Sequence, residues 1–143
     1  QEITSDVKFD LYGINNVQPI WADHYFKTIS NAKMGLNLSR GEAIKYYSSD
    51  RITQIVGNGL VCLIDEKTKY RDFFSNDEMI FYKNLSDLSE KIQKISRDDK
   101  LRRKIAKKGK EKYMKYFNST KVAEFIIDKG LDLKNKNKYF WHN

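Results

Sequence analysis

The sequence predicts an α/β fold: a three-layer Rossmann-like domain with a small parallel sheet and a C-terminal helical block. Short apolar runs of strand length alternate with helical patterns up to Tyr82. One of them, Leu60–Ile64, is continuously apolar, which is typical of a parallel strand buried on both faces. Beyond Asn84 the apolar residues recur every three to four positions, which indicates helices to near the end of the chain.

In the N-terminal part we expect a strand, a helix and a second strand. Val7–Tyr12 alternates apolar and polar residues and stops at Gly13, so it predicts the first strand. Trp21–Ala32 predicts a helix with its apolar residues on one face. Met34–Leu38 is a short apolar run that predicts the next strand, followed by a loop.

The middle of the chain predicts a helix between two strands. Asp50–Val56 has a helical pattern, Ser48 or Ser49 can cap its start, and Gly57-Asn58-Gly59 ends it. The segment before it, Gly41–Ser49, is mostly polar and predicts a loop. Leu60–Ile64 and Met79–Tyr82 predict the remaining strands.

Three helices are predicted in the C-terminal block. The first follows the cap candidates Asn84 and Ser86, the second opens at Asp98 and Asp99, and the third is capped by Asn118-Ser119-Thr120. The last residues, Leu133–Asn143, predict a polar tail that carries an aromatic patch, Tyr139–Trp141.

Length and composition favour one domain over residues 1–143 and exclude several classes of protein. No run approaches the roughly 20 apolar residues that a membrane span needs. Cys62 is the single cysteine, so no disulfide forms within the chain, and with only His24 and His142 besides we expect no metal site. A reducing, cytoplasmic setting fits this composition. Because the chain starts at Gln1 without Met, we expect a fragment of a longer protein.

The net charge of +8 indicates an anionic partner: nucleic acid, a phosphate-bearing ligand or a membrane surface. Lysines and arginines crowd Lys91–Lys121, where the acids are Asp98, Asp99 and Glu111. The run is either a solvated helical face or a polyanion-binding module. A nucleic-acid surface would interleave stacking aromatic residues with the basic run, and beyond Tyr113 and Tyr116 such interleaved residues are missing. We therefore expect no nucleic-acid partner and keep an anionic membrane surface as a candidate.

A ligand site is expected where loops leave the predicted parallel strands. In open parallel sheets, ligands bind beyond the carboxyl ends of strands, beside helix N-termini. Asn37–Arg40 and Ser48–Arg51 occupy such places. The helix start offers free N–H groups, the serines add hydroxyls, and Arg51 can form two parallel hydrogen bonds to phosphate. The alternative is an ordinary serine cap with a surface arginine.

Gln54 lies one helical turn beyond Asp50 and could reach a ligand hydroxyl or point into solvent. Tyr46 and Tyr47 could stack on a base or sugar, or could merely cover a loop. The candidate binding residues are Asn37, Ser39, Arg40, Ser48, Ser49, Asp50, Arg51 and Gln54. No Walker-type or GxGxxG pattern is present.

Several short motifs, taken in order, resemble those of one enzyme family. They are Tyr12-Gly13, Lys33–Ser39, Asp50–Gly59, Asp77-Glu78 with Phe81-Tyr82 and Asp87-Leu88, and Arg102–Gly109. This order resembles the C-terminal domain of GT-B glycosyltransferases, in particular the "glycosyl transferases group 1" and CgeB-like domains.

The resemblance implies that this domain binds the nucleoside diphosphate of a nucleotide-sugar donor, without a cofactor or metal. Ser49 and Arg51 would lie near the diphosphate, and Asn37–Arg40 would line the cleft. At the place of Gln54, members of the family usually have a glutamate that binds the ribose hydroxyls. A non-catalytic scaffold is therefore an alternative.

By the same resemblance, an N-terminal domain of the same protein would hold the acceptor and the catalytic base. The fragment alone would then be inactive, and no catalytic residue is assigned within it. The resemblance also implies assembly of bacterial cell-envelope polysaccharide in the cytoplasm, at or near the inner face of the membrane.

Overall fold

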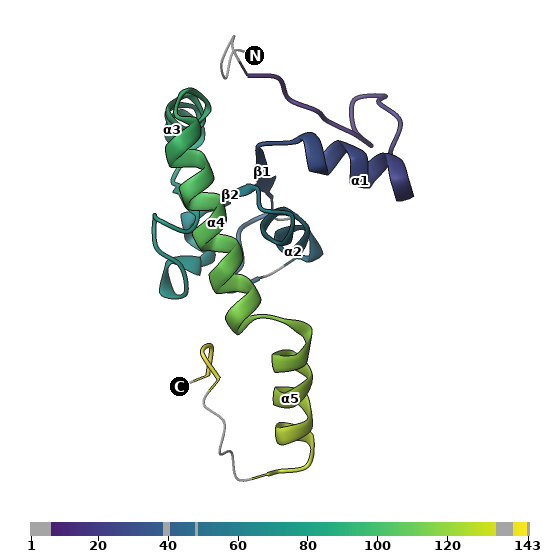
Figure 1. Ribbon diagram of the computed structural model, residues 1–143, viewed down its shortest axis with the longest axis vertical. Helices are drawn as coiled ribbons and strands as arrows, with labels where there is room; N and C mark the ends of the chain where they lie inside the picture. The colour runs from purple at the N-terminus through teal and green to yellow at the C-terminus, as the bar shows by residue number, and fades with distance from the viewer. Residues whose placement is uncertain (1–6, 39–40, 48, 134–138, 143) are drawn as a thin grey trace.

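The computed structural model of the protein describes residues 7–38, 41–47, 49–133 and 139–142. It is an α/β structure with a small parallel sheet and helices packed around it (Figure 1). In chain order the elements are α1 (Ala22–Asn31), β1 (Met34–Asn37), α2 (Asp50–Gly57), β2 (Val61–Asp65), the 3-10 turns η1 (Glu66–Thr68) and η2 (Tyr70–Asp72), β3 (Ile80–Tyr82), α3 (Leu85–Arg97), α4 (Asp99–Tyr116) and α5 (Ser119–Gly130). The predicted helices and all but the first of the predicted strands are confirmed.

The sheet has the order β1-β2-β3, and both pairings are parallel. Met34 pairs with Val61, and Leu63 pairs with Ile80. Helix α2 connects β1 to β2, as in a βαβ unit, and η1 and η2 lie between β2 and β3. The carboxyl ends of the three strands therefore meet at one edge of the sheet.

Both faces of the sheet are covered, which explains the continuous apolar pattern of β2. Cys62 and Ile64 point to the face that packs against Ile52, Ile55 and Val56 of α2. Their neighbours Val61 and Leu63 point to the opposite face, which packs against three buried residues of α3: Leu88, Ile92 and Ile95. This alternation confirms the predicted three-layer arrangement.

Helix α4 belongs to both layers because it runs across the sheet from one core to the other (Figure 1). Its first half buries Ile105 and Ala106 in the α3 core, and its second half buries Tyr113 in the α2 core. Between them, Gly109 lets the helix backbone touch the loop before β3. A Cβ atom at this position would lie 2.3 Å from the Glu78 carbonyl oxygen, so only glycine fits without displacement.

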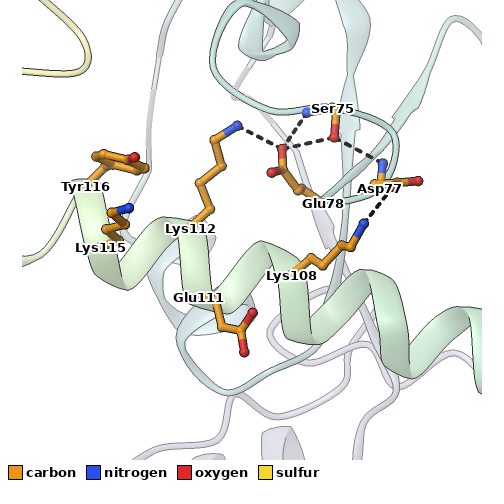
Figure 2. Close-up of a pocket in the computed structure, with 8 residues that line it drawn as sticks. All are labelled: Ser75, Asp77, Glu78, Lys108, Glu111, Lys112, Lys115 and Tyr116. Atoms are coloured by element: carbon orange, nitrogen blue, oxygen red, sulfur yellow. Dashed lines mark hydrogen bonds and ion pairs between the residues drawn. The ribbon is translucent and has the colours of Figure 1, made fainter.

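The same loop is fixed to α4 by ion pairs that line a shallow groove of about 420 Å³ (Figure 2). Lys112 Nζ lies 2.9 Å from Glu78 Oε2, and Lys108 Nζ lies 2.8 Å from Asp77 Oδ2. Glu78 Oε2 also accepts hydrogen bonds from the backbone N–H and hydroxyl of Ser75. Partial burial raises the pKa of Glu78, but these hydrogen bonds and the Lys112 ammonium outweigh it and hold the pKa below its ordinary value.

Helix α5 packs against the C-terminal turn rather than against the sheet. The Phe125 ring meets Tyr139 and Trp141 edge-on, and the Tyr139 hydroxyl donates to the Asp128 carboxylate. Trp141 in turn stacks on Phe117 at the end of α4. The aromatic patch predicted in the polar tail is therefore a packing element, and Tyr139 is buried.

The predicted strand over Val7–Tyr12 is wrong. These residues are irregular in the structure, and Phe9 and Leu11 are exposed. Only Val7 packs partly against the α3 core. An alternating pattern reports a tendency to form a strand, whereas pairing also requires a neighbouring strand edge in register. Here the chain does not follow the outer edge of β1, so its alternation leaves the apolar residues in solvent.

Replacing Gly109 by alanine should destabilise the fold. The new methyl group would press on the Glu78 carbonyl oxygen, and such overpacking costs about 1–3 kcal/mol. Gly130→Ala is the matched control, because a Cβ at that position meets nothing within 4 Å. Denaturant unfolding of both variants measures the difference. Equal stability of the two variants would show that the α4 contact is not tight.

Acid should weaken the contact between α4 and the loop before β3. The pKa of Glu78 is lowered in the folded state, so its stabilising contribution is complete above the ordinary value of 4.5. That contribution is lost as the pH falls through the lowered pKa. We expect Glu78→Gln to cost roughly 1 kcal/mol at neutral pH and to flatten the acid limb of stability against pH. The control is Glu111→Gln, which removes an exposed carboxylate 3.8 Å from Lys107; an unchanged acid limb in Glu78→Gln would contradict the assignment.

Candidate functional site

The carboxyl end of β1 and the start of α2 form the predicted ligand-binding edge. Asn37 ends β1 and pairs in register with Ile64 of β2. Ser49 precedes α2, and its hydroxyl donates to Asn37 Oδ1 at 3.0 Å. Two predicted site residues that are 12 positions apart in the sequence therefore touch at this edge.

Asn37 and Ser49 hold the edge together. Asn37 is 3% exposed, and a buried side-chain amide needs hydrogen-bond partners. Ser49 occupies the N-cap position of α2, as predicted, but its side chain forms no cap hydrogen bond. Its hydroxyl is turned towards Asn37 instead. The Ser49 hydroxyl therefore accepts no hydrogen bond from the backbone N–H groups in the first turn of α2.

Arg51 binds the chain directly after β1. Its Nη1 donates to the Leu38 carbonyl oxygen at 2.6 Å, which holds the exposed guanidinium beside the end of the strand. A guanidinium carries five N–H donors, so this contact leaves most of them available. Arg51 therefore has a structural contact and also places a cation at the predicted edge.

The other predicted residues of α2 are less engaged. Gln54 is half-buried, and within the described part of the chain its side-chain amide forms no hydrogen bond. Asp50 is exposed in the first turn, where its charge favours the helix dipole but opposes a bound anion. The remaining predicted residues, Ser39, Arg40 and Ser48, lie outside the described residues.

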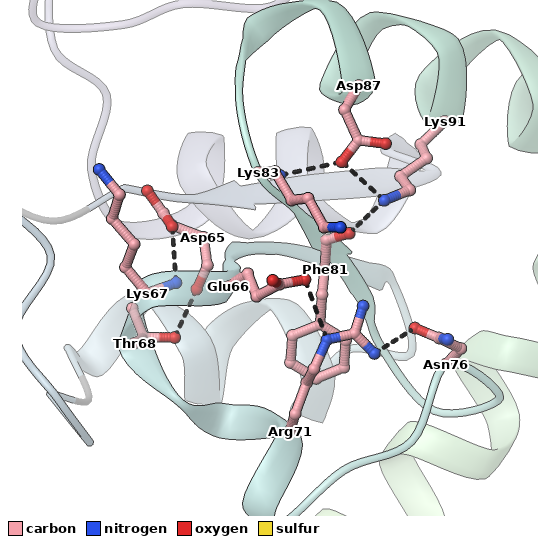
Figure 3. Close-up of polar contacts among 10 residues, drawn as sticks. All are labelled: Asp65, Glu66, Lys67, Thr68, Arg71, Asn76, Phe81, Lys83, Asp87 and Lys91. Carbon is pink, nitrogen blue, oxygen red and sulfur yellow. Dashed lines mark hydrogen bonds and ion pairs between the residues drawn. The ribbon is translucent and has the colours of Figure 1, made fainter.

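The loop after β2 follows the strand that neighbours β1. Asp65 caps η1 by accepting from the Lys67 backbone N–H at 2.8 Å, and the Thr68 hydroxyl donates to the Asp65 carbonyl oxygen (Figure 3). The Thr68 carbonyl oxygen accepts from the Tyr46 backbone N–H at 2.8 Å. This bond ties residues 41–47 to the loop after β2, so the segments that follow two neighbouring strands are joined.

Charged groups around β3 and the loop after it form contacts that stabilise the fold. Lys91 Nζ donates to the Phe81 carbonyl oxygen at 2.6 Å and lies 2.7 Å from Asp87 Oδ2 (Figure 3). The Lys91 hydrogen bond lowers the pKa of Asp87, with help from the Lys83 backbone N–H. Arg71 donates to Glu66 and lies over the Phe81 ring. These residues are paired with one another.

Two lysines at this edge were missed by the sequence reasoning. Lys67 follows β2 and Lys83 follows β3, and both are exposed. Among the described residues, neither ammonium group forms an ion pair. The signal was present, because each is the first lysine after a strand that was predicted correctly. It was obscured by the abundance of lysine in this chain.

The structure also decides between the alternatives for Tyr46 and places Cys62 in the core. The Tyr46 hydroxyl donates to Asp72 at 2.6 Å, and its ring packs against Phe73. This hydrogen bond raises the pKa of Tyr46, and the residue covers a loop. Burial raises the pKa of the Cys62 thiol to about 12, as expected of an inert core residue.

The groove beside α4 is a weaker candidate for a ligand site. Ser75, Asp77 and Glu78 precede β3, so they lie away from the carboxyl edge where Asn37 and Arg51 meet. Its two acids already pair with Lys108 and Lys112. Among the described residues, no cluster of His, Cys, Asp and Glu could hold a metal ion. In that part of the chain, no helix has the length and apolarity to cross a membrane.

Comparison with known proteins identifies the family. A family model described as "glycosyl transferase-like" matches residues 2–128, which include every predicted binding residue. A search of curated proteins and a search of solved structures each gave no match. The match covers most of the chain and agrees with the parallel α/β sheet. The chain therefore belongs to the glycosyl transferase-like family.

Proposed function

We propose that this chain is the donor-binding domain of a glycosyltransferase and that it holds the nucleoside diphosphate of a nucleotide sugar. The observation that carries the proposal is the meeting of Asn37, Ser49 and Arg51 where β1 ends and α2 begins. Parallel α/β sheets bind ligands at this kind of edge. Membership of the glycosyl transferase-like family supports sugar transfer as the reaction.

The charges at the edge suit a diphosphate leaving group. Arg51 keeps N–H donors beyond its bond to Leu38, and the start of α2 adds the positive end of a helix dipole. Lys67 and Lys83 follow the two neighbouring strands and add exposed cations. Such groups would stabilise the negative charge that develops on the diphosphate as the sugar leaves. In this proposal the cations of the protein stabilise the leaving diphosphate, without a metal or cofactor.

The rest of the reaction requires a second domain. We place the acceptor site and the catalytic base in an N-terminal domain of the same protein, in the two-domain GT-B arrangement. The chain would then bind the donor weakly by itself and transfer no sugar. The setting we propose is the cytoplasm, with the cell-envelope polysaccharide of a bacterium as the product.

A non-catalytic scaffold is a second candidate, and two observations favour it. Gln54 replaces the glutamate that the resemblance to GT-B glycosyltransferases implies, and Arg51 already makes a contact that the fold itself can use. A scaffold would keep the fold and lose nucleotide binding. Titration with nucleotides separates the two candidates.

Nucleoside diphosphates should bind at the start of α2. In a two-dimensional NMR titration with UDP, GDP and ADP, we expect at least one nucleotide to shift the resonances of residues 49–59. Shifts confined to other regions, or none at all, would favour the scaffold.

Replacing Arg51 should remove most of this binding. A hydrogen bond to a charged group contributes about 1.5–3 kcal/mol, so Arg51→Gln should weaken binding roughly tenfold or more. Arg103→Gln is the control, because Arg103 is an exposed arginine on α4, 3.6 Å from Asp99. The dispersion of the NMR spectrum checks that each variant is folded. Equal affinities of the two variants would exclude Arg51 from the site.

Gln54→Glu should distinguish the ribose contact from the phosphate contact. A carboxylate accepts stronger hydrogen bonds from hydroxyl groups than an amide does. We therefore expect the variant to bind UDP more tightly relative to inorganic pyrophosphate, which has no ribose. Calorimetry with both ligands measures the ratio of the two affinities. A ratio that does not change would place Gln54 away from the ribose.

A further inference from the structure

The solvent-facing side of α4 carries a row of cations, which we call the basic face. The opposite side of the helix is buried and includes Ile105, Gly109 and Tyr113. Helix α4 has 18 residues and is roughly 27 Å long, and the row from Lys100 to Lys115 extends over about 22 Å of it. The basic face consists of Lys100, Arg103, Lys104, Lys107, Lys110 and Lys115, all of them exposed.

The charge of the basic face is poorly compensated. Glu111 lies within it and is 3.8 Å from Lys107, while Arg103 is 3.6 Å from Asp99, which Arg102 also binds. The Lys107–Glu111 and Arg103–Asp99 contacts are long and exposed, so solvent screens them. Within the described part of the chain, Lys100, Lys104, Lys110 and Lys115 form no ion pair. The fold does not depend on these cations, because other residues, Lys108 and Lys112, fix α4 to its neighbours.

The helix that follows presents apolar residues to solvent. Helix α5 begins at Ser119, shortly after α4 ends at Tyr116, and projects away from the sheet (Figure 1). Its Phe125 and Asp128 side is covered by the C-terminal turn. Away from that turn, four apolar residues are 41–67% exposed: Val122, Ile126, Ile127 and Leu131. A strongly basic surface is thus followed by an apolar one.

We propose that the basic face of α4 docks on an anionic lipid bilayer and that the apolar residues of α5 enter its headgroup region. Basic residues near apolar ones are the combination that binds peripheral proteins to anionic membranes. A single-stranded nucleic acid would instead need free aromatic rings for base stacking. The two rings of α4 are engaged: Tyr113 bonds to Thr53, and Tyr116 stacks on Phe140 at 4.6 Å between ring centroids. This surface is separate from the proposed donor site.

Vesicle co-sedimentation of the full 143-residue chain tests the proposal. We expect binding to vesicles of phosphatidylcholine mixed with phosphatidylglycerol, no binding to phosphatidylcholine alone, and release by salt. The triple variant Lys100→Gln, Lys104→Gln and Lys107→Gln should bind about tenfold more weakly or worse. The matched triple Lys27→Gln, Lys69→Gln and Lys94→Gln removes the same charge elsewhere and should bind nearly as well as the unchanged chain.

Two further measurements separate the bilayer from other partners. The double variant Ile126→Gln and Ile127→Gln keeps the charge and should be released from the vesicles at a lower salt concentration than the unchanged chain. Duplex DNA and single-stranded RNA serve as competing polyanions. Equal loss in the two lysine triples, absence of binding to the mixed vesicles, an α5 variant that binds normally at every salt concentration, or tighter binding to nucleic acid would each overturn the proposal.

Discussion

The close approach of α4 to the loop before β3 is the contact on which the rest of the structure depends. Because Gly109 has no side chain, the helix backbone meets the Glu78 carbonyl oxygen directly. At this distance α4 buries Ile105 in one core and Tyr113 in the other, so a single helix closes both faces of the sheet. The Lys112–Glu78 and Lys108–Asp77 pairs then fix its rotation. A larger spacing would open both cores at once.

The strands and helices with a clear apolar pattern were predictable because the residues in that pattern are the ones that the structure buries. Leu60–Ile64 is apolar throughout because both of its faces are covered, and the helical spacing after Asn84 matches the buried side of α3. The segment Val7–Tyr12 shows the limit of that reasoning. Its alternation resembles that of a strand, but the sequence does not reveal whether a partner edge lies within reach.

The sequence predicted where in the fold the candidate site lies, but it did not predict which of its residues contact one another. The carboxyl edge followed from the expectation of parallel strands, and the structure brings Ser49 to Asn37 and Arg51 to Leu38 there. The bonds from Ser49 to Asn37 and from Arg51 to the Leu38 carbonyl oxygen join residues that are 12 and 13 positions apart, and no local sequence pattern predicts them. Ser49 shows this well, because a serine before a helix suggests a cap, whereas its hydroxyl turns to a buried asparagine. Lys67 and Lys83 were hidden among many other lysines.

Helix α5 is attached to the rest of the molecule less tightly than α3 and α4, which both bury residues in the cores. Helix α5 has no buried residue of its own, and its order comes from the C-terminal turn, through Phe125, Tyr139 and Trp141. The sheet with α2, α3 and α4 rests on a continuous interior instead. Local opening of α5 therefore exposes little apolar surface and leaves the sheet intact. Its amide protons would exchange with solvent well before those of β2, and α5 would be able to change its shape without unfolding the carboxyl edge of the sheet.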